Sequence, residues 1–371
     1  MADYKKYQSD GVSAEDKALD KFAELMIEKI ESLKNSDSWK QPWFTEGSLR
    51  WPRNLSGREY NGMNALLLMM LCEKQNYKLP VFCTFNRAVG LNYTTDKQGA
   101  KKPITDADGQ PLPRVGINKG EKSFPVMLTT FTVVDKDTKE KINYEDYKRL
   151  SNDEKAQYNV YPKLNVYQVF NVDQTNLKEA RPDLYAKLES ENKLQRPFSG
   201  EGESFKFPAM DAMIAENKWI CPINLVHQDN AYFSISKNQI TLPEKSQFKD
   251  GESFYGTAFH EMTHSTGTAE MFNRFNPESG FGSAEYAKEE LVAELGSALV
   301  AQRYGMTKNL KDDSAVYMKS WLDSLKESPS FIKTTLMDVK RATSVITQRI
   351  DEVALELEAK QSQTNDKSVS M

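Results

Sequence analysis

The sequence has 371 residues, enough for two domains or for one large domain with a substantial core. Its 39% hydrophobic and 27% charged residues are typical of a water-soluble globular protein, and its longest apolar run is far too short to span a bilayer. The net charge of −4 argues against a general nucleic-acid binder. Residues 1–15 show no secretory signal and the three cysteines show no paired spacing, so we expect a cytoplasmic protein without disulfides or membrane contact.

Charge is distributed unevenly along the chain. Between Lys40 and Pro125 there are 13 Lys or Arg against 7 Asp or Glu, whereas the rest of the chain is acidic overall. This asymmetry indicates two domains with different partners.

The first half has the pattern of a mixed α/β domain. Residues 1–13 are polar and predicted to be disordered, and apolar residues at helical spacing predict a helix over 14–33. A second helix over 65–72 is apolar nearly all round, which predicts that it is buried. Later segments predict an exposed loop over 94–112, strands over 124–134 and 164–172, a charged insertion between those strands, and a short helix with a polar linker over 173–195.

The second half is predicted to be mostly helical. Its patterns indicate helices over 208–217, 253–266, 284–304, 314–326 and 331–359, and one strand over 232–240. The polar segment 361–371 is predicted to be a disordered tail. We therefore predict an α+β protein with domains at 14–195 and 196–360.

A metal-binding motif lies on the helix predicted over 253–266. His260 and His264 are four residues apart, so both imidazoles project from one face and can hold one ion. Glu261 follows the first histidine and is placed to act as general base and general acid. A chance match of five residues is the alternative, although the chain has only three histidines.

A further ligand is expected from the helix predicted over 284–304. Glu290 and Glu294 share one face of that helix, as in the Glu-x-x-x-Asp/Glu helix of gluzincin-type metallopeptidases. We assign Glu290 as the third ligand, with Glu289 as its rival. Glu294 is expected to accept the N–H of a ligand histidine. Zinc is the ion best suited to these ligands, with manganese and cobalt as alternatives.

Aromatic and cationic residues alternate in the first half, for example in Trp39-Lys40-Gln41-Pro42-Trp43 and in Arg50-Trp51-Pro52-Arg53-Asn54. Single-stranded nucleic acid needs aromatic rings for its bases and cations for its phosphates. The alternative is that the tryptophans belong to the core and the arginines form a solvated face.

Together these features resemble the ArdC-type antirestriction proteins of conjugative plasmids and phages. The resemblance is carried by Pro52-Arg53-Asn54, Gly57-Arg58-Glu59-Tyr60-Asn61-Gly62-Met63-Asn64, Asn118-Lys119-Gly120-Glu121-Lys122, Phe170-Asn171-Val172-Asp173-Gln174-Thr175, Phe259-His260-Glu261-Met262-Thr263-His264-Ser265-Thr266-Gly267, and Tyr286-Ala287-Lys288-Glu289-Glu290-Leu291-Val292-Ala293-Glu294. Segments near 96–111 and 135–161 look like insertions relative to shorter members.

The resemblance implies an N-terminal domain that binds single-stranded DNA and a C-terminal zincin-like metallopeptidase domain. The candidate DNA contacts are Trp39, Trp43, Arg53, Asn54, Arg58, Tyr60, Asn61, Asn64, Arg87, Lys119 and Lys122. The implied function is antirestriction, with a zinc peptidase acting on a restriction enzyme or another DNA-bound protein. Two alternatives stay open: a DNA-binding protective protein whose metal site is structural or inactive, and a metallopeptidase without nucleic-acid function.

Overall fold

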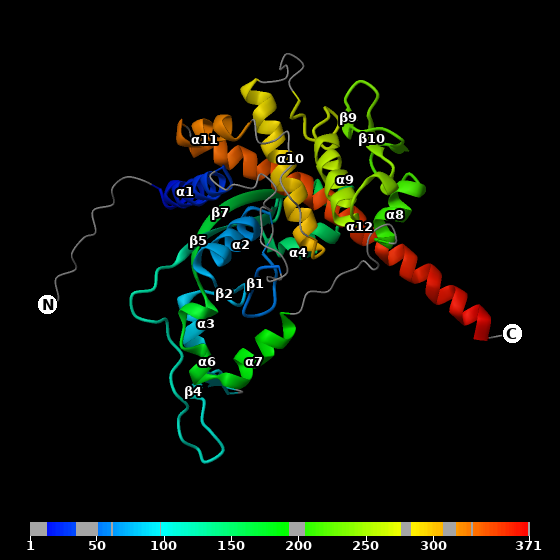
Figure 1. The fold of residues 1–371 in the computed structure, drawn as a ribbon. Coiled ribbons are helices and arrows are strands. Elements are labelled where there is room, and N and C mark those ends of the chain that lie inside the picture. Colours follow the sequence, from blue (N-terminus) through cyan, green and yellow to red (C-terminus); the bar gives the residue numbers. More distant parts are fainter. Residues whose placement is uncertain are drawn as a thin grey trace.

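Figure 1 shows the fold of the computed structural model. The structure describes residues 13–34, 51–60, 62–96, 98–192, 205–275, 283–306, 317–327 and 329–369. None of the helices within these ranges combines the length and the hydrophobicity needed to cross a bilayer.

The first half mixes helices and strands, as predicted. Its elements are α1 (Ala14–Lys34), β1 (Arg53–Asn54), α2 (Met63–Gln75), β2 (Val81–Cys83), α3 (Phe85–Gly90), β3 (Tyr93–Thr95), β4 (Lys101–Pro103), β5 (Phe124–Asp135), β6 (Lys141–Ile142), α4 (Tyr144–Arg149), α5 (Asn152–Lys155), β7 (Tyr158–Asn171), η1 (Val172–Gln174), α6 (Leu177–Ala180) and α7 (Pro182–Glu191).

The second half is largely helical. Its elements are α8 (Pro208–Ala215), β8 (Ile223–Val226), β9 (Tyr232–Ser234), β10 (Gln239–Pro243), η3 (Lys245–Gln247), α9 (Gly251–Ser265), α10 (Ala284–Arg303), α11 (Met318–Glu327) and α12 (Pro329–Val369).

The main sheet has five strands in the order β1-β2-β7-β5-β6. Its centre is the long antiparallel hairpin of β5 and β7, which stays in register from Phe124 opposite Val169 to Asp135 opposite Tyr158. The charged block predicted as an insertion forms the far end of this hairpin, with β6, α4 and α5. The loop predicted over 94–112 contains the small β3–β4 hairpin.

A three-stranded sheet in the order β8-β10-β9 belongs to the second half. β10 pairs in parallel with β8 and antiparallel with β9. One continuous strand was predicted over 232–240, and that prediction is wrong. The chain turns between Ser234 and Gln239, and Asn238 adopts a left-handed φ of 45° there. Asparagine tolerates that conformation better than most residues, which suits a tight turn.

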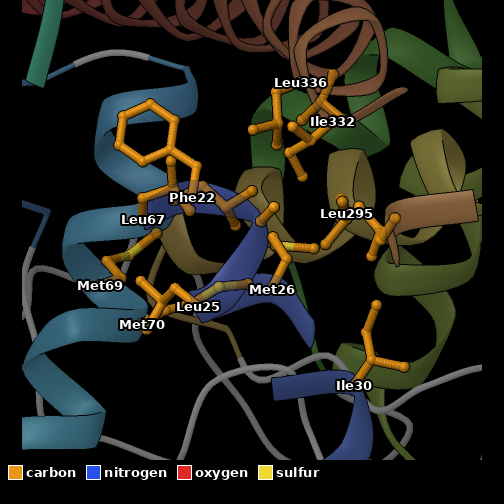
Figure 2. Close-up of a cluster of buried hydrophobic side chains, with 14 of the residues drawn as sticks. Phe22, Leu25, Met26, Ile30, Leu67, Met69, Met70, Leu295, Ile332 and Leu336 are labelled. Carbon is orange, nitrogen blue, oxygen red and sulfur yellow. The ribbon is translucent and has the colours of Figure 1, made fainter. Parts of the chain in front are cut away.

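The largest apolar cluster joins the two halves of the chain. It contains residues of α1, α2, β5 and β7 together with residues of α10, α11 and α12. Figure 2 shows Phe22, Met26 and Leu67 in one cluster with Leu295 and Leu336. The two segments predicted as domains, 14–195 and 196–360, thus share buried side chains. The helix that carries the predicted glutamate ligand is therefore packed directly against the N-terminal half.

A second apolar cluster packs against α9, the helix that carries the histidine motif. It includes Phe207 just before α8, Phe254 and Phe259 of α9, Val300 of α10 and Ile346 of α12. Because α10 contributes to both clusters, its position is fixed from two directions.

The C-terminal helix is longer than predicted. α12 continues through residues 361–369, where a disordered tail was expected, and Figure 1 shows its end projecting from the body. The segment after Pro329 contains no glycine or proline that would end a helix, so polarity alone was a poor guide to disorder. The other segment predicted to be disordered, 1–13, lies outside the described residues except for Ser13.

Candidate metal centre

The helix α9 begins and ends with well-defined caps. The Asp250 side chain accepts a hydrogen bond from the Ser253 N–H at 2.7 Å, which satisfies a free donor at the first turn. At the other end, the Gly267 N–H donates to the His264 carbonyl at 2.7 Å. His260 and Glu261 are almost completely buried, with exposed fractions of 1% and 2%. The motif therefore lies inside the protein on a well-formed helix.

The helix α10 lies unusually close to α9. A Cβ atom on Gly296 would lie 2.8 Å from Thr263 Cγ2, so glycine is needed where the two helices approach. The Ser283 side chain caps α10 by accepting from the Tyr286 N–H at 3.1 Å. This packing places Glu289, Glu290 and Glu294 beside the histidines.

Three side chains converge in the arrangement expected of metal ligands. The Nε2 atoms of His260 and His264 are 3.1 Å apart. Glu290 Oε2 lies 3.5 Å from His260 Nε2, and Glu290 Oε1 lies 3.7 Å from His264 Nε2. One ligand atom from each residue falls within 4.8 Å of the others. Two nitrogens that each lie about 2.0–2.1 Å from a shared zinc ion are separated by roughly 3 Å, so the observed spacing fits an ion.

The opposite nitrogen of each histidine faces a carboxylate. His260 Nδ1 lies 3.5 Å from Glu294 Oε1, and His264 Nδ1 lies 3.1 Å from Glu289 Oε1. Glu294 thus lies on the Nδ1 side of His260. Glu289, the rival for the ligand role, lies on the far side of the His264 ring, whereas Glu290 faces both Nε2 atoms. The hydrogen bond between His264 Nδ1 and Glu289 fixes that ring with Nε2 towards the candidate ion.

Burial and charge act in opposite directions on the ionisation of this cluster. Burial favours neutral His264, but the hydrogen bond to Glu289 and the charges of Glu290 and Glu289 raise its pKa. Burial likewise favours a neutral Glu290, yet the hydrogen bond to His260 and the charges of both histidines lower its pKa to about 2. The Glu290 carboxylate is therefore ionised at neutral pH and can ligate a cation.

Sequence reasoning missed one member of the cluster. Arg274 follows α9 by nine residues and shows no periodic relation to the motif, but its guanidinium contacts Glu289 at 2.8 Å. Its position depends on the chain folding back after α9, where the Arg274 N–H bonds to the Gly267 carbonyl. Only that turn, which the sequence pattern does not reveal, brings Arg274 to the site.

Several candidate DNA contacts serve structural roles. Arg53 forms an ion pair with Glu191 at 3.0 Å, and the Asn54 side chain accepts from the Ser56 and Arg58 N–H groups in a turn. The Asn64 side chain makes two hydrogen bonds to the Met127 backbone, at 2.6 and 3.0 Å. Tyr60 packs edge-on against Phe82, and burial raises its pKa to about 12. These side chains are held in place by the protein itself.

Four cationic candidates lie on the surface, namely Arg58, Arg87, Lys119 and Lys122. Phe85, on the same short helix as Arg87, is 55% exposed, which is unusual for a phenylalanine. The predicted contacts Trp39, Trp43 and Asn61 lie outside the described residues.

Comparison with known proteins matches both halves of the chain. Residues 16–170 match the N-terminal domain of the anti-restriction factor ArdC, and residues 208–336 match a zincin-like metallopeptidase. Two relatives from Escherichia coli are both named DNA primase TraC. One is 29% identical over 352 residues, covering 92% of this chain and 20% of the relative. The other is 25% identical over 353 residues, covering 94% and 28%. The chain thus spans about a fifth to just over a quarter of these relatives.

Solved structures show the same fold. The metal-free crystal structure of the antirestriction ArdC protein from plasmid R388 aligns with a TM-score of 0.60 at 22% identity, covering 90% of this chain and 98% of that one. The Mn(II)-bound structure of that protein aligns with a TM-score of 0.59, also at 22% identity, covering 90% of this chain and 97% of that one. The two matched domains occur in the order that the motifs predicted. The chain therefore has an ArdC-type N-terminal domain followed by a zincin-like metallopeptidase domain, and it shares the fold of the R388 ArdC protein.

Proposed function

We propose that this chain is an antirestriction protein that binds single-stranded DNA and cleaves DNA-associated proteins at a zinc centre. The observation that carries the peptidase part is the convergence of His260 and His264 of α9 with Glu290 of α10. Glu261 is buried on α9, next to His260 in the sequence. The DNA-binding part is supported by the ArdC N-terminal domain match and by exposed cations in that half.

The ligand residues and Glu261 have separate roles in the proposed peptide hydrolysis. His260, His264 and Glu290 would hold the ion, which supplies Lewis-acid chemistry to a peptide carbonyl when bound. The Glu261 carboxylate takes a proton from the attacking water and delivers it to the nitrogen of the leaving amine. Zinc fits two imidazoles and one carboxylate, and manganese is accepted by the same donor types.

The edge strand β9 is the proposed place where the substrate backbone binds. β9 pairs with β10 along one side and contacts α9, the helix of the metal centre. Phe233 of this strand stacks on Phe275, with ring centroids 6.1 Å apart, which anchors the strand near the end of α9. An extended peptide can add to such an edge through backbone hydrogen bonds.

The DNA-binding half would bring the peptidase to its substrates. Arg58, Arg87, Lys119 and Lys122 can contact phosphates, and the exposed Phe85 ring can stack on a base. A peptidase tethered to single-stranded DNA meets proteins on that DNA at a high effective concentration. A restriction enzyme subunit is one such substrate.

Glu261→Gln in the full chain tests the peptidase. Because Gln is nearly the same size and Glu261 is not a proposed ligand, the variant should keep zinc and oligonucleotide binding but lose proteolysis. Glu285→Gln is a matched control, since Glu285 is an exposed glutamate on α10. If Glu261→Gln still protects incoming DNA as well as the parent protein, protection comes from DNA binding and the peptidase is not required.

A pair of lysine substitutions tests the proposed DNA surface. Lys119→Ala/Lys122→Ala should weaken binding to a labelled oligonucleotide. The slope of log affinity against log salt concentration should also become shallower by about 0.7 for each phosphate that is no longer neutralised. Lys237→Ala/Lys249→Ala removes two exposed lysines of the other half and serves as the control. The full chain is needed because the two halves share a core. Equal salt dependence in both variants would remove this surface from the proposal.

A further inference from the structure

A buried arginine lies behind the metal centre, on the segment that follows α9. The Arg274 side chain is 5% exposed. Its Nε and Nη2 atoms donate to the two Glu289 carboxylate oxygens, each at 2.8 Å. Nη1 donates to Thr266 Oγ1 at 2.9 Å, and Nη2 also donates to the Thr263 carbonyl at 2.8 Å. The guanidinium therefore joins Glu289 of α10 to the C-terminal end of α9.

Glu289 also contacts the candidate metal ligand His264. Its Oε1 atom, which accepts from Arg274, also lies 3.1 Å from His264 Nδ1. A carboxylate can only accept at that position, so Nδ1 carries the proton of the neutral ring and Nε2 presents its lone pair to the candidate ion. Without a fixed acceptor, the His264 ring could turn or exchange its protonated nitrogen.

The same contacts separate two neighbouring glutamates. Glu289 and Glu290 are adjacent on α10, and either could have approached the ion. Arg274 binds both oxygens of Glu289 and keeps them on the Nδ1 side of His264, while Glu290 faces the two Nε2 atoms. The planar fork of an arginine suits this double contact, whereas a lysine offers one charged nitrogen.

We propose that Arg274 is a positioning residue of the metal centre, which holds Glu289 against His264 and thereby fixes Nε2 of His264 and the Glu290 carboxylate as metal donors. This rests on the proposed metal centre. Arg274 would touch neither the ion nor the substrate and would act only through Glu289.

Zinc affinity and the visible spectrum of the cobalt-substituted protein test this role. Arg274→Met in the full chain should weaken zinc binding by about 10- to 100-fold, as loss of a partner behind a ligand does, and should alter the Co(II) absorption bands. Arg274→Lys should recover part of the affinity because it restores the charge. Arg303→Met is the control, since Arg303 also lies on α10 but forms its ion pair with Glu59, away from the site.

A second variant distinguishes the loss of positioning from misfolding. Arg274→Met leaves the buried Glu289 charge without its partner, which can unfold the site, whereas Arg274→Met/Glu289→Met replaces both members by apolar side chains. This double variant should fold and still bind zinc less tightly, because His264 has lost its acceptor. If it binds zinc as tightly as the parent protein with the same Co(II) spectrum, the positioning role is wrong. If the parent protein itself binds neither metal, the metal centre is wrong, and the variants are not needed to show it.

Discussion

Replacing Gly296 by alanine tests whether the close approach of α9 and α10 sets the geometry of the metal centre. In an isolated helix, this substitution stabilises by about 1 kcal/mol because alanine restricts the unfolded chain. Here the new methyl group would lie 2.8 Å from Thr263 Cγ2 and 3.0 Å from Thr263 Oγ1. The steric contact therefore opposes the gain in helix propensity.

Thr263 has little freedom to yield. Its side chain is fully buried, and its Oγ1 donates to the Phe259 carbonyl at 2.7 Å. Turning the side chain away would break that bond, at a cost of about 1 kcal/mol. Overpacking in a core typically costs about 1–3 kcal/mol. Set against the propensity gain, the net change is a destabilisation of about 0–2 kcal/mol, with α10 displaced outward.

The assay compares Gly296→Ala with Gly90→Ala by urea unfolding and by zinc titration. Gly90 is also helical, but a Cβ atom there meets nothing within 4 Å, so its replacement should be neutral or stabilising. Gly296→Ala should bind zinc about tenfold more weakly, because Glu290 and Glu294 move with α10. Adding Thr263→Ser removes the Cγ2 methyl and should recover part of the stability and of the zinc affinity. If Gly296→Ala is as stable as Gly90→Ala and binds zinc like the parent protein, helix spacing does not control the site.

Three other predictions concern the metal, the pH and the first half of the chain. Chelation should lower the unfolding temperature by several degrees, since an ion at 100 times its Kd stabilises the native state by about 2.7 kcal/mol; equal melting curves with and without chelator would contradict the metal centre. Glu289 and Glu290 raise the pKa of His264 above its usual 6.5 despite burial. In metal-free protein, the protonated His264 ring therefore contributes its full stabilisation to the folded state below pH 6.5, and this stabilisation is lost as pH rises through the pKa of the folded protein. Metal ligation instead needs the neutral ring, so the difference in unfolding temperature between metal-loaded and metal-free protein should widen from about pH 6 to pH 8 in calorimetry, and a constant difference would refute this. Asn64→Ala should cost about 1–3 kcal/mol of unfolding free energy by leaving the Met127 backbone without its partner, while the salt dependence of oligonucleotide binding stays unchanged; a loss of DNA affinity at full stability would assign Asn64 to the DNA surface instead.

The helical parts of the fold were the most predictable from sequence. The helix predicted over 14–33 became Ala14–Lys34, and the one over 284–304 became Ala284–Arg303, because long apolar periodicity determines which face is buried. Likewise, the spacing of His260 and His264 needs only a helix to bring the two rings together. Features that depend on local geometry were predictable when they lay within one element.

Features that depend on contacts between segments far apart in the sequence, or on where the chain folds back, were not predictable. Arg274 reaches Glu289 only because the segment after α9 folds back. The choice between Glu289 and Glu290 depends on how α10 is rotated against α9, which the close approach at Gly296 helps to fix. Asn64 lies in a motif shared with ArdC-type proteins, but its hydrogen-bond partner is the Met127 backbone, 63 residues away. The motif alone did not reveal this contact.

The shared core has a consequence for local unfolding of the protein. Leu295 of α10 packs in one cluster with Phe22 and Leu67 of the N-terminal half, while Val300 of the same helix packs with Phe259 beside the metal motif. Local unfolding of either half must therefore loosen α10. Ion binding should consequently slow amide hydrogen exchange in α1 and α2 as well as in α9. The two halves would then form one cooperative unit, in which occupancy of the metal centre stabilises the helices of the N-terminal half.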